Sequence, residues 1–302
     1  MSSAELVLLI IFSLLILVNL VGNTLVCLVV LGTKSMGTPM NYLLVNLAVA
    51  DMTVALFITP QYIFRPFLDH RRPPLGDYLC KVATGGNLTW IGSAASVFTL
   101  VSIAFERYYS ITFPHSHTGR LTHRKAKIWI LTSWLVAVAT EIPPIITMRF
   151  SVSHNICIED WRDIHQARTY TVITFLIDFA IPFSLISVLY GSVLRKLWVS
   201  NLCKATHVAL LRRRKKVTLL LFTVTSLHGA SLLPDTVAYF LSYFGFKYSS
   251  IAYQVGTVFI CLNATVNPFI YSLHSERFRK SLRKLFRWRA THARVTIPRQ
   301  RQ

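Results

Sequence analysis

Apolar segments that are long enough to cross a lipid bilayer recur along almost the whole of this 302-residue chain. A helix needs about 20 apolar residues to span the hydrocarbon core of a membrane. Seven such segments can be delimited, at residues 6–31, 40–65, 82–109, 126–147, 168–197, 215–243 and 250–273. Hydrophobic residues make up 53% of the chain and charged residues only 15%, so much of its surface must face lipid rather than water. We therefore predict an all-α membrane protein built as a bundle of seven transmembrane helices.

The basic residues predict how this bundle is oriented. Twenty-four of the 32 Lys and Arg residues fall in the connections on one side and in the C-terminal tail. Short cytoplasmic loops carry such an excess, so we expect the N-terminus outside the plasma membrane and the C-terminus in the cytoplasm. The net charge of +20 then fits attraction to anionic lipid, and no nucleic-acid partner is expected.

Four parts follow from these segments. Residues 1–5 form a short extracellular N-terminus, and residues 6–273 form the transmembrane domain. Residues 274–288 are predicted to form an amphipathic helix in the membrane interface, because Phe278, Leu282, Leu285 and Phe286 recur at helical spacing among bases. Residues 289–302 form a basic cytoplasmic tail. No internal repeat is apparent, which disfavours a transporter built from duplicated halves.

Polar residues within the apolar segments are costly in lipid, so each one needs a structural or functional reason. In chain order they are Gly22-Asn23, Asn46 with Asp51, Glu106-Arg107-Tyr108, Trp134, Pro182 with Tyr190, Pro234, and Asn267-Pro268 with Tyr271. This ordered set resembles the rhodopsin-like class of G-protein-coupled receptors over essentially the whole chain. The resemblance implies a receptor without enzymatic activity that signals through a cytoplasmic heterotrimeric G protein.

Further residues resemble the neuropeptide branch of that class, which includes receptors for Arg-Phe-amide peptides, orexin, neuropeptide Y and tachykinins. They are Pro60, the segment Cys157-Ile-Glu-Asp-Trp161 and the segment Tyr190-Gly-Ser-Val-Leu-Arg-Lys-Leu-Trp198. The branch implies an extracellular peptide ligand, possibly amidated. The alternatives are a receptor-like protein for a lipid or another small molecule, a receptor with reduced signalling, and, less favoured, a transporter.

The resemblance assigns roles to several of these positions. Coupling to the G protein and activation are expected at Glu106, Arg107, Tyr108, Tyr190, Asn267, Pro268 and Tyr271. A site for a sodium ion or water is expected at Asp51, Ser96, Asn263 and Asn267. The alternative for Asp51 is a protonated carboxyl in a water-filled hydrogen-bond network. No other cofactor is expected.

Cysteine placement and the resemblance together predict one disulfide. Cys27 and Cys261 lie within apolar segments, and Cys203 faces the reducing cytoplasm. Cys80 and Cys157 face the oxidising side, so they are the available pair. Bonding them would tie the second outer loop to the third helix.

Four departures from the class concern the activation switch and the third helix. Leu232 and His228 stand where the class has Trp and Phe, and Arg214 stands where an acid is usual in the sixth segment. We therefore expect a weaker resting-state lock and some basal activity. Cys80 also precedes Arg107 by two residues more than usual, and Gly85-Gly86 is the expected insertion.

Rare acidic residues predict the charge of the ligand. Glu141, Asp178 and Asp235 lie in the outer or middle parts of predicted spans, where an unpaired carboxylate is costly, and Glu159 lies in the second outer loop. We expect these four acids to bind a cationic peptide. The alternative is that the acids stay protonated or pair internally with His residues or with Arg149, Arg162 and Arg168.

Overall fold

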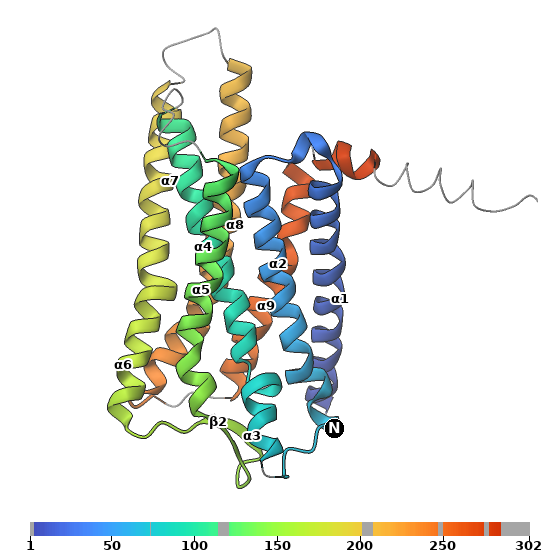
Figure 1. Cartoon of the computed structure of the whole chain (residues 1–302), viewed down its shortest axis with the longest axis vertical. Helices are drawn as coiled ribbons and strands as arrows, with labels where there is room; N and C mark the ends of the chain where they lie inside the picture. Colours follow the sequence, from blue (N-terminus) through green and yellow to red (C-terminus); the bar gives the residue numbers. More distant parts are fainter. Residues whose placement is uncertain are drawn as a thin grey trace, which may run out of the picture.

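Long helices run side by side and form an elongated bundle, as the predicted fold class requires (Figure 1). The structure, a computed structural model, describes residues 3–72, 74–113, 121–200, 208–246, 250–274 and 278–284. The long helices are α1 (Ser3–Gly32), α2 (Pro39–Thr59), α4 (Asn87–Thr112), α5 (His123–Thr147), α7 (Ile181–Ser200), α8 (Val208–Ser242) and α9 (Ser250–His274). Shorter elements extend them: the turns η2 (Pro60–Phe64), η4 (Cys80–Thr84) and η5 (Phe175–Ala180) and the helices α3 (Leu75–Leu79) and α6 (Ile164–Thr174).

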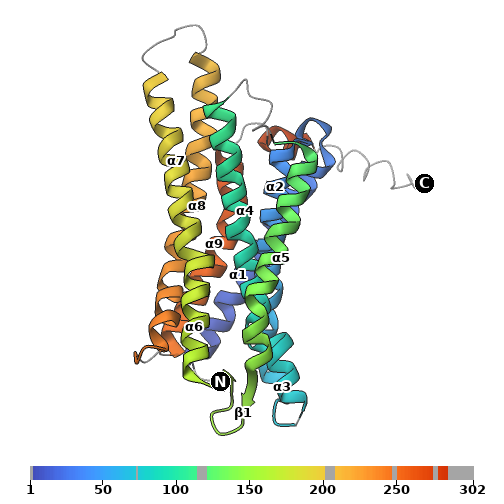
Figure 2. The same ribbon diagram turned by 60° about the vertical axis from the view of Figure 1, so that its left-hand side comes forward.

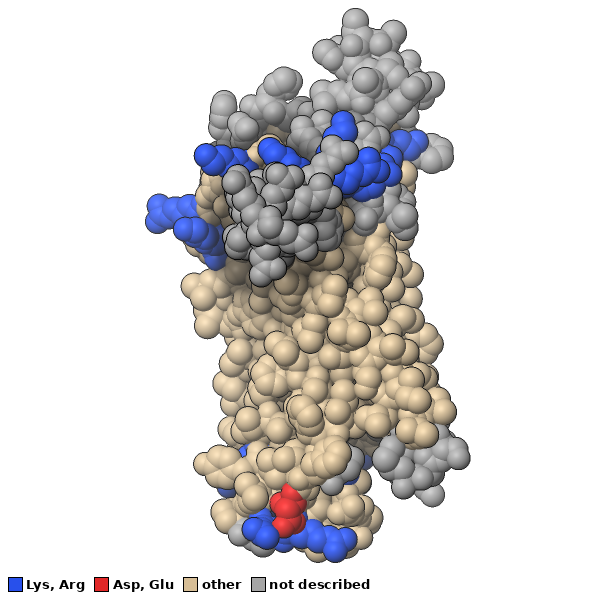
Figure 3. Space-filling view, turned by 90° about the vertical axis from the view of Figure 1, so that its right-hand side faces the viewer, with Lys and Arg blue, Asp and Glu red and all other residues tan. Residues whose placement is uncertain are grey.

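Each predicted apolar segment overlaps one long helical segment of the bundle. Among the residues that the structure describes, six of these segments are long and apolar enough to cross a membrane, and α9 packs against α1, α2 and α8 as the seventh. Large apolar side chains such as Leu14, Leu17 and Leu135 are exposed along the middle of the bundle. On the face shown in Figure 3, a broad band without Lys, Arg, Asp or Glu covers this middle part. Its composition suits the hydrocarbon region of a bilayer.

The two ends of the bundle differ in charge. One end carries the exposed residues Lys34, Arg124, Lys125 and Lys127, and we call it the basic end. The other end carries a two-stranded hairpin, and we call it the hairpin end. Helix α1 begins at the hairpin end of the bundle (Figure 2).

Polar side chains are buried between the helices, together with the apolar side chains of the core. Asn46 in α2 joins three helices, because its amide nitrogen donates to Thr99 Oγ1 in α4 at 2.7 Å and its carbonyl accepts from Trp134 Nε1 in α5 at 2.9 Å. Asn23 in α1 donates to the carbonyl of Ala264 in α9 at 3.1 Å. Lipid offers no hydrogen-bond partners, so these contacts fix which faces of the helices meet.

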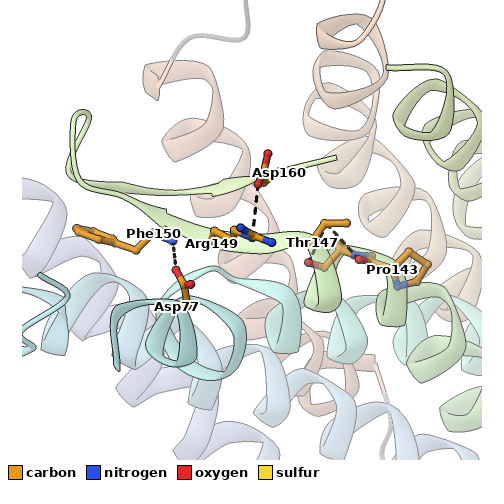
Figure 4. Close-up of polar contacts among 7 residues, drawn as sticks. Asp77, Pro143, Thr147, Arg149, Phe150 and Asp160 are labelled. Atoms are coloured by element: carbon orange, nitrogen blue, oxygen red, sulfur yellow. Dashed lines mark hydrogen bonds and ion pairs between the residues drawn. The ribbon is translucent and has the colours of Figure 1, made fainter. Parts of the chain in front are cut away.

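The hairpin at the hairpin end consists of two antiparallel strands, β1 (Met148–Ser151) and β2 (Ile156–Glu159). Asn155, which adopts a left-handed backbone with φ of 54°, completes the turn between them. Asp77 in α3 accepts a hydrogen bond from the backbone N–H of Phe150 at 2.8 Å, and Arg149 pairs with Asp160 at 3.5 Å (Figure 4). The predicted disulfide is confirmed, because Cys157 in β2 is bonded to Cys80 in η4. The hairpin itself was not predicted.

The third span is interrupted where the extra residues were expected. The turn η4 ends at Thr84, and α4 begins at Asn87 after Gly85 and Gly86. Gly86 has a φ of +88°, a left-handed conformation that favours glycine. The break shifts the outer part of this span relative to α4, which accounts for the longer distance in sequence between Cys80 and Arg107.

The predicted interfacial helix is helical where it is described, at residues 278–284. Phe278 is buried and Leu282 packs beside it on the core of the bundle, while Arg279, Lys280, Arg283 and Lys284 are exposed. This part is therefore amphipathic. Residues 275–277, residues 285–288 and the predicted tail lie outside the described residues.

Helices α2 and α4 approach most closely at Gly92. A Cβ atom at this position would lie 2.9 Å from the backbone nitrogen of Val54 and 3.0 Å from the carbonyl oxygen of Ala50. Both atoms belong to a helix backbone, which cannot rotate away as a flexible side chain can. The helices would have to separate locally to accommodate any larger residue.

We predict that Gly92→Ala lowers the stability of the bundle by about 1–3 kcal/mol, the usual cost of overpacking a core. Thermal unfolding of the purified chain in lipid nanodiscs measures this. Gly191→Ala is the control, because nothing lies within 4 Å of a Cβ there and alanine favours a helix. Equal melting temperatures for the two variants would contradict the close approach.

Candidate functional site

A cavity of about 600 Å³ opens toward the hairpin end of the bundle. Residues from η2, α4, α5, the hairpin, η5, α8 and α9 line it, so nearly every span contributes. Its polar lining includes the acids Glu141, Glu159, Asp178 and Asp235. All four residues that the sequence predicted to bind a ligand therefore surround one cavity.

The cavity is strongly acidic. Among the described residues that line it, Arg65 is the single Lys or Arg, and its guanidinium donates to the backbone carbonyl of Asn155 at 2.8 Å. Two of the arginines named as alternative internal partners contact other groups, because Arg149 pairs with Asp160 and Arg168 donates to the carbonyl of Tyr243 at 2.9 Å. The described lining thus holds more acidic than basic side chains.

Glu141 and Asp178 are the least satisfied of these acids. Glu141, in α5, is only 8% exposed. Within the described part of the chain its side-chain carboxyl forms no hydrogen bond or ion pair. Asp178, in η5, has one buried carboxylate oxygen without a hydrogen-bond partner. A buried carboxyl without a partner costs several kcal/mol when it is charged, so both positions favour a cation or a proton.

Glu159 is held differently, by neutral donors. Its carboxylate accepts hydrogen bonds from Tyr239 Oη at 2.9 Å, Tyr243 Oη at 2.7 Å and Trp161 Nε1 at 2.8 Å. Glu159 is therefore fixed in place at the mouth of the cavity.

Three π-helical turns shape the lining. They are η2, η4 and η5, which place Gln61, Tyr62, Thr84 and Asp178 on the cavity. A π turn inserts one residue into a helix and turns the next side chains to a new direction, and such turns often occur at functional sites. The periodicity of an ordinary α-helix does not predict these side-chain directions. The one local sign is a proline or glycine within two residues of an end of each turn.

The wall opposite Glu141 is neutral and polar. Gln61 donates to Tyr253 Oη at 2.8 Å, and Tyr62 Oη donates to Thr257 Oγ1 at 3.3 Å. These contacts join η2 to α9 beside the cavity. Gln61, Tyr62 and Tyr253 were not among the predicted site residues, and their side-chain types alone carried no signal for a site.

A second polar group lies deeper, around Asp51. Its carboxylate accepts from Ser96 Oγ at 3.1 Å and from Asn267 Nδ2 at 2.7 Å, which joins α2, α4 and α9. Asn263 was expected here as well, but its amide contacts His228 Nδ1 at 2.6 Å instead. His228 in α8 competes for this amide where an aromatic ring would not, and the role of Asn263 in a sodium or water site stays a prediction.

The oxygens of Asp51 and Ser96 are hard ligands of the kind that alkali and alkaline-earth cations prefer, so these two residues could hold a sodium ion. Within the described residues, no group of three or more His, Cys, Asp or Glu side chains could hold a metal ion. Leu232, the other departure in the sixth span, is buried and lines the floor of the cavity. His228 in α8 contacts Asn263 in α9, and Asp51 contacts Ser96 and Asn267.

The residues expected to couple to a partner lie in α4, α7 and α9. Arg107 forms an ion pair with Glu106 at 2.5 Å, and both side chains are largely buried in the absence of a partner. Tyr108 packs against Ile111, while Tyr190 in α7 is fully buried. Asn267 belongs to the Asp51 group. Helix α9 contains Pro268 and Tyr271, but the side chains of Tyr271 and Arg214 lie outside the described residues.

Comparison with known proteins places this arrangement in a family. The family described as 7 transmembrane receptor (rhodopsin family) matches residues 22–271. The allatostatin-A receptor of Bombyx mori is 31% identical over 283 residues, which cover 89% of this chain and 76% of the relative. Neuropeptide FF receptor 1 of Homo sapiens is 30% identical over 92% of this chain and 69% of its own length.

A third relative and a solved structure agree. The QRFP-like peptide receptor of Branchiostoma floridae is 27% identical over 95% of this chain and 79% of its own length. The crystal structure of squid rhodopsin superposes with a TM-score of 0.78 at 24% identity, over 95% of this chain and 86% of the rhodopsin chain. At that identity the likeness shows the shared fold.

Proposed function

This chain belongs to the rhodopsin family of seven-transmembrane receptors, and we propose that an extracellular cationic peptide activates it to signal through a cytoplasmic heterotrimeric G protein. Two of the relatives are named as receptors for neuropeptide FF and for a QRFP-like peptide. The observation that carries the proposal is the cavity, whose lining holds four acids and, among the described residues, one arginine. Its volume suits a peptide end or a few side chains rather than a whole folded partner.

The charge of the two ends supports an orientation with the cavity outside the cell. The basic end fits the cytoplasmic side of the plasma membrane, where short connections carry an excess of Lys and Arg. The hairpin end carries the disulfide between Cys80 and Cys157, and disulfides persist on the oxidising side. A ligand would therefore enter past the hairpin, and a G protein would bind at the opposite end.

The cation of the ligand would bind Glu141 and Asp178. These two acids line the cavity from α5 and η5, and each has carboxylate capacity that no described group uses. An arginine side chain would satisfy a carboxylate with two parallel hydrogen bonds and remove the cost of its burial. Glu159 at the mouth would draw a basic ligand inward and raise its association rate.

We predict that Glu141→Gln and Asp178→Asn each lower the potency of an arginine-containing agonist by about ten- to a hundredfold. A hydrogen bond to a charged group contributes about 1.5–3 kcal/mol, which corresponds to this range. A panel of synthetic peptides with and without a terminal arginine, tested on cells with a promiscuous G protein, provides the agonist and the measurement.

Asp160→Asn is the matched control, because Asp160 is an exposed acid beside the cavity and its loss changes the net charge equally. Potency should stay within about threefold of the unsubstituted chain in this variant, since an exposed ion pair contributes little. Activation by a neutral lipid, or unchanged potency in both cavity variants, would refute the electrostatic assignment.

Coupling to the G protein would depend on Arg107. In the resting arrangement its guanidinium is held by Glu106 and largely buried, so the partner can reach it only when the helices around it move. Pro234 in α8 lacks a backbone N–H and provides a point about which the cytoplasmic part of that helix can turn. Outward movement of α8 would expose Arg107 to the partner.

We predict that Arg107→Ala abolishes agonist-driven nucleotide exchange while peptide binding at the cavity is retained. The charge that the partner would meet is removed, and the cavity lies at the other end of the bundle. Exchange on purified G protein and radioligand binding are measured on the same membranes. Full agonist-driven exchange in Arg107→Ala would remove this residue from the coupling step.

Asp51 supports a related proposal, that a sodium ion binds its carboxylate and Ser96 Oγ in the resting receptor. Sodium would then favour the resting state and oppose agonist binding through linkage. We predict that sodium chloride lowers agonist affinity more than potassium chloride at equal ionic strength, and that Asp51→Asn abolishes the difference. Equal effects of the two salts on the unsubstituted chain would favour a water-filled network at Asp51 instead.

A further inference from the structure

The Glu159 carboxylate is the shared acceptor for three donors that come from two parts of the chain. Trp161 lies two residues beyond the end of β2. Tyr239 lies in the last turn of α8 and Tyr243 lies one residue beyond that helix, 80 and 84 residues after Glu159. Tyr239 and Tyr243 are four residues apart, about one helical turn, so both phenols lie on one face at the end of α8. We call Glu159, Trp161, Tyr239 and Tyr243 the outer latch.

The acceptor side of the outer latch is fixed to the third span. Cys157, two residues before Glu159, is bonded to Cys80 in η4. Glu159 also pairs with Met148 in the hairpin register, and Met148 is buried. The carboxylate therefore cannot move far from η4 without breaking the hairpin or the disulfide.

The donor side belongs to the part of α8 that follows Pro234. A proline in a helix leaves one carbonyl without its usual partner and loosens the connection between the segments on either side. Tyr239 lies five residues beyond this point, so contacts outside α8 decide where its last turns lie. The phenols supply two of them, and Arg168 in α6 adds a third by donating to the carbonyl of Tyr243 and lying 5.6 Å from the ring of Phe244.

We propose that Glu159 is a positioning residue, and that the outer latch holds the end of α8 against the hairpin and so restrains the sixth span in its resting position. Two phenols and an indole converge on one carboxylate, and charge-assisted hydrogen bonds of this kind are about twice as strong as neutral ones. Glu159 then acts on signalling through α8, in addition to the charge that it gives the mouth of the cavity. The link to signalling rests on the proposed function, whereas the restraint itself does not.

Hydrogen exchange tests the restraint without any ligand or G protein. The full chain in lipid nanodiscs is compared with the pair Tyr239→Phe and Tyr243→Phe, which keeps both rings and removes only the hydroxyls. Backbone amides at 240–246 should exchange at least about tenfold faster in this variant, because local opening of the helix end becomes easier. Glu159→Leu should produce the same change, and Asp160→Asn, which removes an equal charge beside it, should not.

The combined variant distinguishes a latch from general destabilisation. Once Glu159→Leu has removed the acceptor, replacing the two tyrosines should add less than about twofold to the exchange rate, because coupled residues are not additive. If the effects of the two changes on the exchange rate multiply, the latch is refuted. Unchanged exchange at 240–246 in both Glu159→Leu and the tyrosine pair variant would also refute it. Surface labelling of an N-terminal epitope in cells checks that each variant folds and reaches the membrane.

Ligand-free nucleotide exchange on a purified G protein tests the link to signalling. Both latch variants should raise this basal rate at least about twofold over the Asp160→Asn control, because the freed segment no longer opposes turning about Pro234. Faster amide exchange with an unchanged basal rate would overturn the link while the restraint stands. No nucleotide exchange in any variant, the unsubstituted chain and agonist included, would instead refute the proposed function.

Discussion

The cost of a polar group in lipid is the constraint on which this structure depends. Backbone and side-chain polar groups find no water in the hydrocarbon region, so each must be satisfied within the bundle. Asn46 meets this demand by joining α2, α4 and α5, and Asp51 does so by joining α2, α4 and α9. The same contacts fix the rotation of each helix, which in turn decides which side chains face the cavity.

The two acids Glu141 and Asp178 do not follow this rule. Both line the cavity, and each has carboxylate capacity that no described group uses. In the proposed function, a cationic ligand satisfies these acids on binding. At the other end Arg107 pairs with Glu106, and both side chains are largely buried. The proposed function would thus place a charge for an external group at each end of the bundle.

The fold could be read from the sequence because its strongest signals are long apolar segments and single polar residues within them. The same reasoning located Gly85 and Gly86 as the interruption of the third span and placed four acids near a common entrance. It did not predict the hairpin, because a short strand pair held by one disulfide has little periodicity of its own. It also placed Asn263 beside Asp51, where the presence of His228 diverts the amide.

The partners of Glu159 show the same limit. The sequence marked this acid as a ligand group, but its tie to Tyr239 and Tyr243 depends on where α8 ends relative to the hairpin, a distance of 80 residues or more in sequence. The π turns that set the direction of Gln61 and Asp178 likewise arise from helix packing. The local sequence pattern thus identifies the acids. Only the assembled bundle shows that Glu159 has hydrogen-bond donors, whereas Glu141 and Asp178 have carboxylate capacity that no described group uses.

The most direct test of the central claim is an experimental structure of the receptor bound to an activating peptide and its G protein. The account predicts a guanidinium or ammonium group of the peptide within about 3 Å of the carboxylate of Glu141 or Asp178, the distance of a charge-assisted hydrogen bond. A peptide whose positive groups all lie outside the cavity, or a bound neutral ligand with both carboxylates unengaged, would contradict it.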